Sequence, residues 1–349
     1  MKRKNLLAAA ALMSTLGALA TAERTEAFVY TACNGNPVVW SGPFFVLQNL
    51  GSISSGGSRE KAVDNAIGRW NGIIGMTDMV MKFPGGSAGT TITTGDGIND
   101  VAVAPRANIG GNNGLTLLTF SLCVFSSSWG EADIFAASDL TYATVQQDVL
   151  ISNSGRSTFM HEFGHAVGLD HHQLFNNMRT PQPRGVVGGT GETIDALPDD
   201  AAAGRFLYPT GNDEINLFAT AQRLKTSTDK ILMNHTGSVS FCSSGGQSIT
   251  LNSTVGNNGT KNVTQNERWW VSTSSNAFKF TDGIQIFGWN NSTFKANKVF
   301  TRQVTFNMPA LPVGSYFLFH GVDAKKEVDE SREDDNVVRE GLKITIVNC

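Results

Sequence analysis

The most constraining feature of this chain is a cluster of histidines near its middle. Four of its six histidines lie in one twelve-residue string, HEFGHAVGLDHH. His161 and His165 are four residues apart, so one face of a helix would aim both imidazoles at the same point. Gly168 follows them, and glycine tolerates the positive φ of a sharp bend at a helix end. The spacing therefore predicts a helix over residues 155–169 and a bend that brings His171 back toward the first two rings.

Three neutral imidazoles with an open fourth position are the ligand set of a catalytic zinc site. Glu162 directly follows the first histidine, so its carboxylate can reach an activated water without binding the metal. Zinc lowers the pKa of such a water from about 15.7 to about 7, and Glu162 then takes the proton as general base. The pattern predicts zinc-dependent hydrolysis. The alternatives are a surface helix whose histidines have other partners, and a structural zinc site without activity.

The string from His161 to His171 matches HExxHxxGxxH, the consensus of the metzincin zinc proteases, and its flanks resemble the matrixin branch. The segments REKAVDNAIGRWN, GEADIFAA and LPDDAAAGRFLYP resemble that family's first supporting helix, its acidic strand and its closing helix. The resemblance covers residues 28–210. It implies one Zn²⁺ held by His161, His165 and His171, with Glu162 as the general base.

The same resemblance implies a Met-turn, in which a methionine underlies the three rings, and Met178 is the match. Without the motif upstream, an ordinary core methionine would be the simpler interpretation. Thr180 stands where other metzincin branches carry a tyrosine, so no phenolate ligand is expected. Asp170 is a candidate to support the site, and His172 is expected to point into solvent.

Matrixins also carry structural calcium, so Ca²⁺ is a second candidate cofactor. Asp133, Asp139 and the pair Asn99–Asp100 are weak candidates for its ligands. A solvated loop carboxylate is the preferred alternative for each of them.

The first residues have the pattern of a secretory signal peptide. Lys2, Arg3 and Lys4 form a positive start, and the apolar run of residues 6–20 is short for a membrane span. Small residues at positions 20–22 predict cleavage before Glu23; an N-terminal anchor is the alternative. We therefore expect a secreted, extracellular protein without a transmembrane segment.

Export would place the four cysteines in an oxidising environment. Their wide spacing does not resemble a Cys-x-x-Cys metal or redox motif. Two disulfides are expected, and three pairings are open. Cys33–Cys123 and Cys242–Cys349 are favoured because each pair then stays inside one expected domain. Free buried thiols are the alternative.

The N-terminal half also shows helical spacing over residues 59–74 and a helix start at Pro198 that runs to Leu207. Residues 214–232 are expected to form a helical linker. Apolar runs predict strands at residues 38–50, 101–103, 115–125 and 132–135.

The C-terminal half has short alternating runs separated by Gly, Asn and Ser turns, which predict a β-sandwich. The strands are expected at residues 248–255, 269–272, 299–306, 316–322 and 342–347. The segment over residues 311–338 resembles the last strands of CARDB-type domains, bacterial Ig-like sandwiches linked with adhesion. The resemblance implies targeting or spacing, with contact to a cell surface or matrix.

Several side chains of this half need an interpretation of their own. His235 and His320 are isolated and expected to be structural, and the tryptophans are expected in the core unless one of them is exposed to a ligand. An acidic run could bind calcium or, as we prefer, form a solvated hairpin. Its members are Asp329, Glu330, Glu333, Asp334 and Asp335.

Together these features predict an α+β metzincin (zincin-like) catalytic domain with a twisted mixed sheet and three main helices, followed by an all-β Ig-like sandwich. The expected parts are a signal peptide (1–22), a catalytic domain (23–212), a linker (213–235) and a CARDB-like sandwich (236–349). This organisation predicts a monomeric zinc endopeptidase acting on protein or peptide substrates. The net charge of −3 gives no case for nucleic acid. The alternative is an adhesion or surface-binding protein whose protease-like domain is secondary or inactive.

Overall fold

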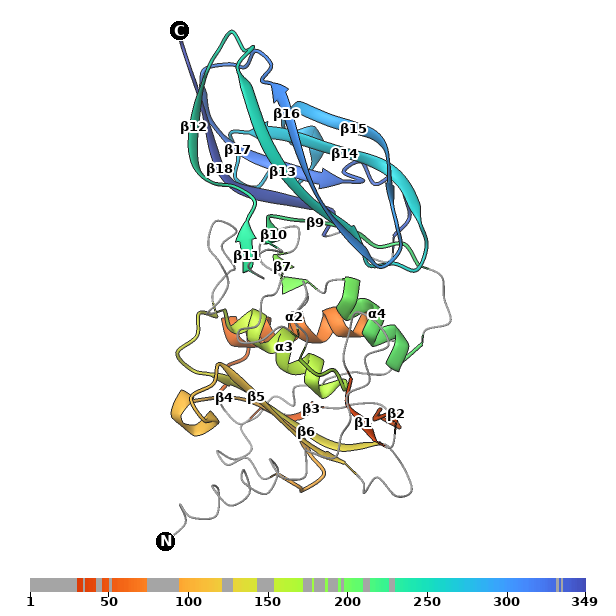
Figure 1. The fold of residues 1–349 in the computed structure, drawn as a ribbon. Helices are drawn as coiled ribbons and strands as arrows, with labels where there is room; N and C mark the ends of the chain where they lie inside the picture. Colours follow the sequence, from red (N-terminus) through yellow and green to blue (C-terminus); the bar gives the residue numbers. More distant parts are fainter. Residues whose placement is uncertain are drawn as a thin grey trace.

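The computed structural model describes residues 30–33, 35–41, 46–49, 52–73, 94–120, 128–142, 154–171, 178, 186–187, 194–195, 198–209, 214–225, 230–330, 333 and 335–349. The predicted signal peptide lies outside these residues. Figure 1 shows the described chain as two stacked parts, with helices over one sheet toward the N-terminus and larger sheets toward the C-terminus. Within the described residues, no helix has the length and apolar character needed to cross a bilayer.

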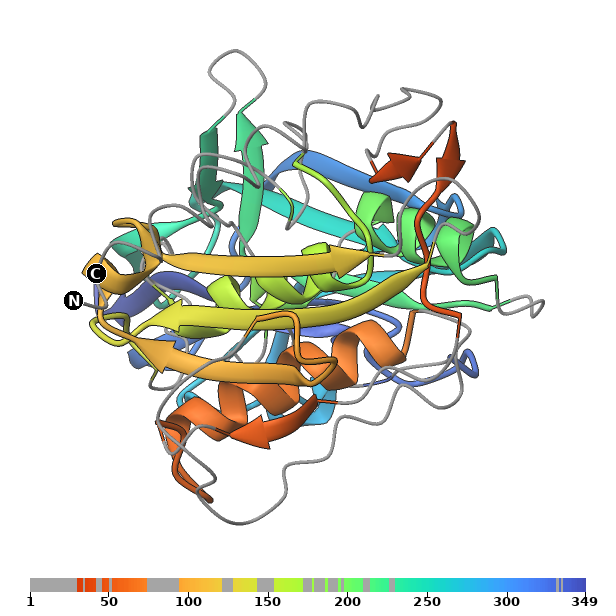
Figure 2. The same cartoon turned by 90° about the horizontal axis from the view of Figure 1, so that it is seen from below.

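A sheet of four strands supports the N-terminal part (Figure 2). In spatial order it contains β3 (Val46–Asn49), β4 (Asn99–Ala104), β6 (Trp129–Ala137) and β5 (Gly114–Phe120). The first three strands run parallel, and β5 pairs antiparallel with β6. The central strands β4 and β6 are buried almost throughout, as expected for apolar strands with both faces covered. β5 lies at an edge and pairs only with β6 among the described residues.

Three α-helices are described: α2 (Ser58–Asn71), α3 (Gly155–Ala166) and α4 (Pro198–Leu207). All three were predicted, and the first two end three residues earlier than the spacing suggested. The buried side chains of α2 recur at helical spacing, so this helix presents one apolar face to the core. α3 is buried on almost every side; His161 is buried with it, whereas His165 is partly exposed.

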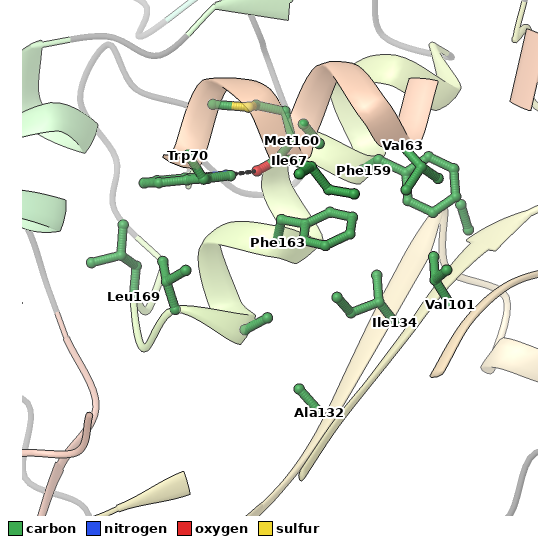
Figure 3. Packing of buried hydrophobic residues seen from close by; sticks show 14 of the residues in the cluster. Val63, Ile67, Trp70, Val101, Ala132, Ile134, Phe159, Met160, Phe163 and Leu169 are labelled. Carbon is green, nitrogen blue, oxygen red and sulfur yellow. Dashed lines mark hydrogen bonds between the residues drawn. The ribbon is translucent and has the colours of Figure 1, made fainter. Parts of the chain in front are cut away.

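The core of the N-terminal part lies where α2 and α3 meet the sheet (Figure 3). Phe159 and Phe163 of α3 are fully buried and face Ile134 of β6. Trp70 of α2 donates a hydrogen bond from its indole nitrogen to the Met160 carbonyl, 3.0 Å away. Because this contact joins the two helices through the backbone of α3, it fixes the position of the helix that carries the histidines.

The predicted fold class, an α+β metzincin domain followed by an all-β sandwich, is wrong for this chain. Strands contain 47% of the described residues and helices 18%, so strand is the commoner regular structure among the described residues. The prediction extended from the zinc motif and three further segments to the architecture of the whole domain. A string of eleven residues specifies how one helix and its bend present side chains, but it does not specify the architecture that supports them.

The C-terminal part is a sandwich of two sheets. The five-stranded sheet contains, in spatial order, β12 (Thr236–Cys242), β18 (Val337–Val347), β17 (Gly314–Val322), β14 (Val263–Ser272) and β15 (Ile284–Phe294). The three-stranded sheet contains β16 (Lys298–Asn307), β13 (Ser248–Asn257) and β9 (Leu217–Thr220). Side chains such as Leu251, Trp269 and Leu318 fill the space between them. All five predicted strands lie within these elements, whereas β9, β12 and β15 were missed.

Short elements complete the described chain. They are the hairpin pairs β1 (Ala32–Cys33) with β2 (Asn36–Pro37), β7 (Val186–Val187) with β8 (Ile194–Asp195) and β10 (Gln222–Lys225) with β11 (Lys230–Met233), and the 3₁₀ turns η2 (Arg106–Ile109) and η3 (Phe280–Asp282). The predicted helical linker over residues 214–232 is wrong, because β9, β10 and β11 occupy it. β9 pairs with β13, so part of this segment belongs to the sandwich.

The predicted disulfide between Cys242 and Cys349 is confirmed, with its Cα atoms 5.5 Å apart. It joins the end of β12 to the last residue of the chain, and β12 runs parallel to β18 just before that residue. The other predicted pairing depends on Cys123, which lies outside the described residues.

Arg205 of α4 connects the two parts of the molecule. Its guanidinium bonds the Asn258 carbonyl, and it forms an ion pair with Glu214 at 3.2 Å. Asn258 follows β13 directly, so a helix of the N-terminal part contacts a turn of the sandwich. Both charged side chains of the pair are largely buried, at 10% and 19% exposure, so solvent screens their attraction less than at the surface.

Candidate metal centre

Three histidines predicted as ligands lie together in the structure. The Nε2 atom of His161 lies 3.2 Å from that of His165 and 3.2 Å from that of His171, and the remaining pair is 3.1 Å apart. Zinc bonds of 2.0–2.1 Å in tetrahedral geometry separate two ligand nitrogens by about 3.3–3.4 Å. The three nitrogens therefore fit a single tetrahedral ion with a fourth position left for another ligand.

The local sequence explains how two of these rings converge. α3 begins at the cap residue Ser154, whose side chain accepts a hydrogen bond from the Ser157 amide at 3.3 Å. It ends at Ala166, and Gly168, which follows the cap residue Val167, adopts a φ of +104°. Its amide donates to the His165 carbonyl at 2.9 Å. A Cβ at Gly168 would lie 3.0 Å from the Val38 carbonyl oxygen, so both the backbone angle and the available space favour glycine here.

Donors from distant segments fix the bend that follows α3. The Trp40 indole donates to the Ala166 carbonyl at 2.7 Å, and the Tyr208 hydroxyl donates to the Val167 carbonyl at 3.0 Å. The Thr31 amide donates to the Gly168 carbonyl at 2.9 Å. These carbonyls have no partner inside the helix, so external donors satisfy them. The direction of the chain toward His171 is thus set by the tertiary structure as well as by the glycine.

Hydrogen bonding determines which nitrogen of His165 is free to bind a metal. Its Nδ1 lies 2.8 Å from the Leu169 carbonyl oxygen, which can only accept. Nδ1 therefore carries the proton, and Nε2 presents its lone pair to the other two rings. Burial, with a smaller effect from neighbouring His171, lowers the pKa of His165 to about 4. Burial also lowers the pKa of His171, so both rings are neutral near pH 7, as metal ligands must be.

Glu162 is buried, with 5% of its surface exposed. The Thr116 hydroxyl on β5 donates to Glu162 Oε2 at 2.7 Å. Burial raises the pKa of the carboxyl to about 8, and the bond from Thr116 opposes part of that rise. A carboxyl with this pKa can both take and return a proton near neutral pH.

Met178 is buried against α3. A Cβ on Gly164 would overlap the Met178 sulfur and would lie 3.0 Å from the Trp70 ring. The methionine therefore fills the space left by a glycine that lies between the first two histidines in sequence. Asp170 accepts the His171 amide at 2.6 Å, a local bond beside the site. His172 and Thr180 lie outside the described residues.

The weak calcium candidates fall into two different environments. Asp100 and Asp133 are buried, and the Asp100 amide donates to Asp133 Oδ1 at 3.2 Å. Burial, reinforced by Glu131, raises the pKa of Asp133 to about 8. Asn99 accepts a hydrogen bond from the Ala132 amide at 2.8 Å. Asp139, by contrast, is exposed and forms an ion pair with Arg106 at 3.0 Å.

The acidic hairpin of the sandwich is only partly the cluster that the sequence suggested. Glu330 and Glu333 lie with Asp323, which the sequence did not single out, and their carboxylate oxygens are within 4.8 Å of one another. Glu330 accepts from the Leu217 amide and from Asn336, so it ties the hairpin to β9. Lys326 lies 3.6 Å from Glu333 and neutralises part of the charge.

Sequence analysis missed a buried polar row between the sheets of the sandwich. His320 Nε2 lies 3.2 Å from Glu267, and its Nδ1 lies 3.9 Å from Glu340. All three side chains are buried, and His320 stacks on Trp269 with ring centres 4.4 Å apart. The expectation that His320 is structural agrees with this packing. Alternation along β14, β17 and β18 could have shown that these polar residues face inward.

No protein-family model matches the chain, and no curated protein matches it. Among solved structures, the crystal structure of the CARDB domain of the PF1109 protein from Pyrococcus furiosus, in complex with di-metal ions, is similar over 39% of this chain and 97% of its own, at 16% identity and a TM-score of 0.26. A solution structure of the same domain has 14% identity, covers 39% of this chain and 98% of its own, and has a TM-score of 0.26.

A β-glucosidase from Erythrobacter marinus has 12% identity, covers 71% of this chain and 28% of its own, and has a TM-score of 0.24. The structural neighbours thus include a CARDB domain. TM-scores this low support no conclusion about activity or ligands. None of these three structures is a metalloprotease, so the zinc and protease predictions have no support from them.

Proposed function

We propose that this chain is a secreted zinc-dependent endopeptidase. The observation that supports this most strongly is the convergence of three imidazole nitrogens, 3.1–3.2 Å apart, and the glutamate that follows the first of them in sequence is buried. His161, His165 and His171 would hold the ion. The match of residues 161–171 to the metzincin consensus supports the same ligand set. A zinc ion held there would acidify a water and polarise a peptide carbonyl.

Glu162 has the properties of a general base. It is next to the first ligand in sequence, and its pKa of about 8, raised by burial, suits proton transfer near neutral pH. The carboxylate would take the proton from the attacking water and deliver it to the nitrogen of the leaving amine. His165 contributes by holding its Nδ1 proton on Leu169, which keeps Nε2 directed at the centre.

The edge strand β5 offers a place for an extended peptide. Its Thr116 contacts Glu162, so the strand passes directly beside the general base. Peptide groups on an unpaired strand edge can bond an added strand, and pockets for alternate side chains then give specificity. A substrate bound along β5 would lie with its backbone extended next to the metal centre. Protein or peptide chains are therefore the substrates that we propose.

The test is cleavage of casein by the mature protein, together with its zinc content. We expect about one zinc per chain and cleavage that a chelator abolishes and added zinc restores. Glu162→Ala should keep the zinc and lose the cleavage. The matched control Glu60→Ala changes a partly exposed glutamate on α2 and should keep both. Cleavage by the Glu162→Ala protein at the wild-type rate would refute the assigned role.

A further inference from the structure

Thr116 is the third residue of the edge strand β5, and its hydroxyl lies against Glu162. The hydroxyl oxygen is 2.7 Å from Glu162 Oε2 and 2.9 Å from the Glu162 carbonyl oxygen. A hydroxyl has one hydrogen, so it can donate to only one of these oxygens at a time, but it can also accept. When the carboxyl is ionised, Thr116 can donate to it. When the carboxyl carries a proton, it can donate to Thr116, which then donates to the carbonyl.

Gly114, two residues earlier on the same strand, leaves room for the same carboxyl. A Cβ at this position would overlap Glu162 Oε1 and would lie 2.7 Å from its carboxyl carbon. Side chains two apart on a strand point to the same face, so both positions of β5 meet the carboxyl from one side. The strand thus leaves space for the carboxyl at Gly114 and offers it a hydroxyl at Thr116, and together these two positions restrict where the carboxyl can lie.

We infer that Thr116 is the positioning residue for the general base, Glu162. This inference rests on the proposed function. The Thr116 hydroxyl keeps the Glu162 carboxyl in one orientation before and after proton transfer. Only 5% of the Glu162 surface is exposed, so few water molecules can replace the Thr116 hydroxyl as its hydrogen-bond partner. Without the hydroxyl, the carboxyl keeps its place on α3 but loses its fixed direction.

The first experiment separates orientation from binding in the full chain. Thr116→Val keeps the shape of the side chain and removes the hydroxyl, whereas Thr116→Ser keeps the hydroxyl. With a quenched fluorescent peptide, we expect Thr116→Val to lower kcat about 10–100-fold with KM within about twofold. Thr116→Ser should restore most of kcat. Zinc content should equal that of the wild type in both variants.

A matched control lies on the same strand. Thr119 is also a β5 threonine, and its hydroxyl faces Gly130 of β6 and not the centre. Thr119→Val should leave kcat unchanged. If Thr116→Val has the kcat of the wild type, or if Thr116→Ser is as impaired as Thr116→Val, the inference is wrong.

A second experiment needs neither zinc nor activity. A double-mutant cycle of melting temperatures reports the contact between Thr116 and Glu162 directly. It compares the metal-free wild type, Thr116→Val, Glu162→Ala and the double variant. We expect Thr116→Val to lower the melting temperature by about 2–4 °C in the wild type. The shift should be smaller in the Glu162→Ala background. Equal shifts in both backgrounds would overturn the contact, and with it the inference.

The two experiments distinguish the possible failures. A wild-type chain that binds no zinc and cleaves nothing would contradict the proposed function, and the melting cycle would still decide whether Thr116 holds the carboxyl. The melting cycle could show coupling while an active Thr116→Val protein has the kcat of the wild type. In that case Thr116 only stabilises the fold, and the positioning role is rejected.

Discussion

The sulfur of Met178 occupies the space that a side chain at Gly164 would need. Gly164 lies on α3 between His161 and His165, so the methionine contacts the helix at the level of the candidate metal centre. Glycine is unfavourable inside a helix by about 1 kcal/mol relative to alanine. The close contact with Met178 explains why this position is glycine in spite of that cost.

Gly164→Ala should therefore destabilise the protein, because overpacking of about 1–3 kcal/mol exceeds the gain in helix propensity. Moving Met178 should also displace the neighbouring rings and weaken zinc binding. Melting temperature and zinc titration measure the two effects. The matched control is Gly68→Ala on α2, where a Cβ would meet no atom within 4 Å, and this change should stabilise the protein. Equal responses at the two glycines would contradict the packing argument.

Zinc should stabilise the folded chain. A ligand that binds only the folded state adds about 4 kcal/mol of stability at a thousandfold excess over its dissociation constant. We expect the melting temperature of the metal-free protein to rise on addition of zinc. The rise should be lost in His171→Ala and kept in Glu162→Gln, because Glu162 is not a ligand. Calorimetry with and without chelator measures the effect, and a rise of full size in His171→Ala would remove this residue from the ligand set.

The buried Asp133 should make stability fall as pH rises. Its pKa is about 8 in the fold, raised first by burial, against an ordinary value of 3.8. Between these values the folded state holds a proton that the unfolded state has released, so rising pH favours unfolding. Thus the melting temperature should decrease from pH 5 to pH 8 in the presence of a chelator. Asp133→Asn, which is neutral at every pH, should reduce that decrease.

Calcium provides the control for this pH dependence. A cation bound beside Asp133 would favour the ionised carboxylate and lower its pKa. If calcium binds there, its addition should flatten the dependence in the wild type and have no effect in Asp133→Asn. An unchanged pH dependence in Asp133→Asn would show that other groups cause it.

Arg205 should couple the unfolding of the two parts of the molecule. Arg205→Met keeps much of the side-chain volume but leaves Glu214 and the Asn258 carbonyl without this donor. Loss of a partner for such buried groups costs about 1–3 kcal/mol. We expect calorimetry to show transitions that lie further apart than in the wild type. The matched control Arg106→Met removes an arginine that pairs with the exposed Asp139, and it should change little. Identical traces for wild type and Arg205→Met would contradict the coupling.

The sequence predicted the local elements of the candidate site better than the architecture around it. Helical spacing and Gly168 carry the information for α3 and its bend, because both depend on the residues themselves. The convergence of His171 with the other rings also follows from that bend. The donors that hold the bend, Trp40 and Tyr208, come from distant segments, so no local pattern could identify them.

The fold class could not be obtained from the same motif. Most of the strand content lies in the sandwich, where the alternating pattern predicted five strands, but β9, β12 and β15 were missed. β9 is four residues long and follows a helix-like pattern, so its pairing with β13 decides its structure. β15 contains Gly288 and several polar residues, which weaken the strand signal. Thr116 was missed because nothing in its neighbours indicates that β5 passes beside Glu162.

The bond between Cys242 and Cys349 also determines how the chain would carry mechanical load. A pull on the C-terminus passes through the disulfide into the end of β12, and residues 243–348, which lie between the two cysteines, are left out of the loaded path. The tension would then reach the segment that leads back to β9 and α4 without first peeling β18 from the sheet. A protein attached by its last residues would therefore keep most of its sandwich intact under tension for as long as that covalent link remains oxidised.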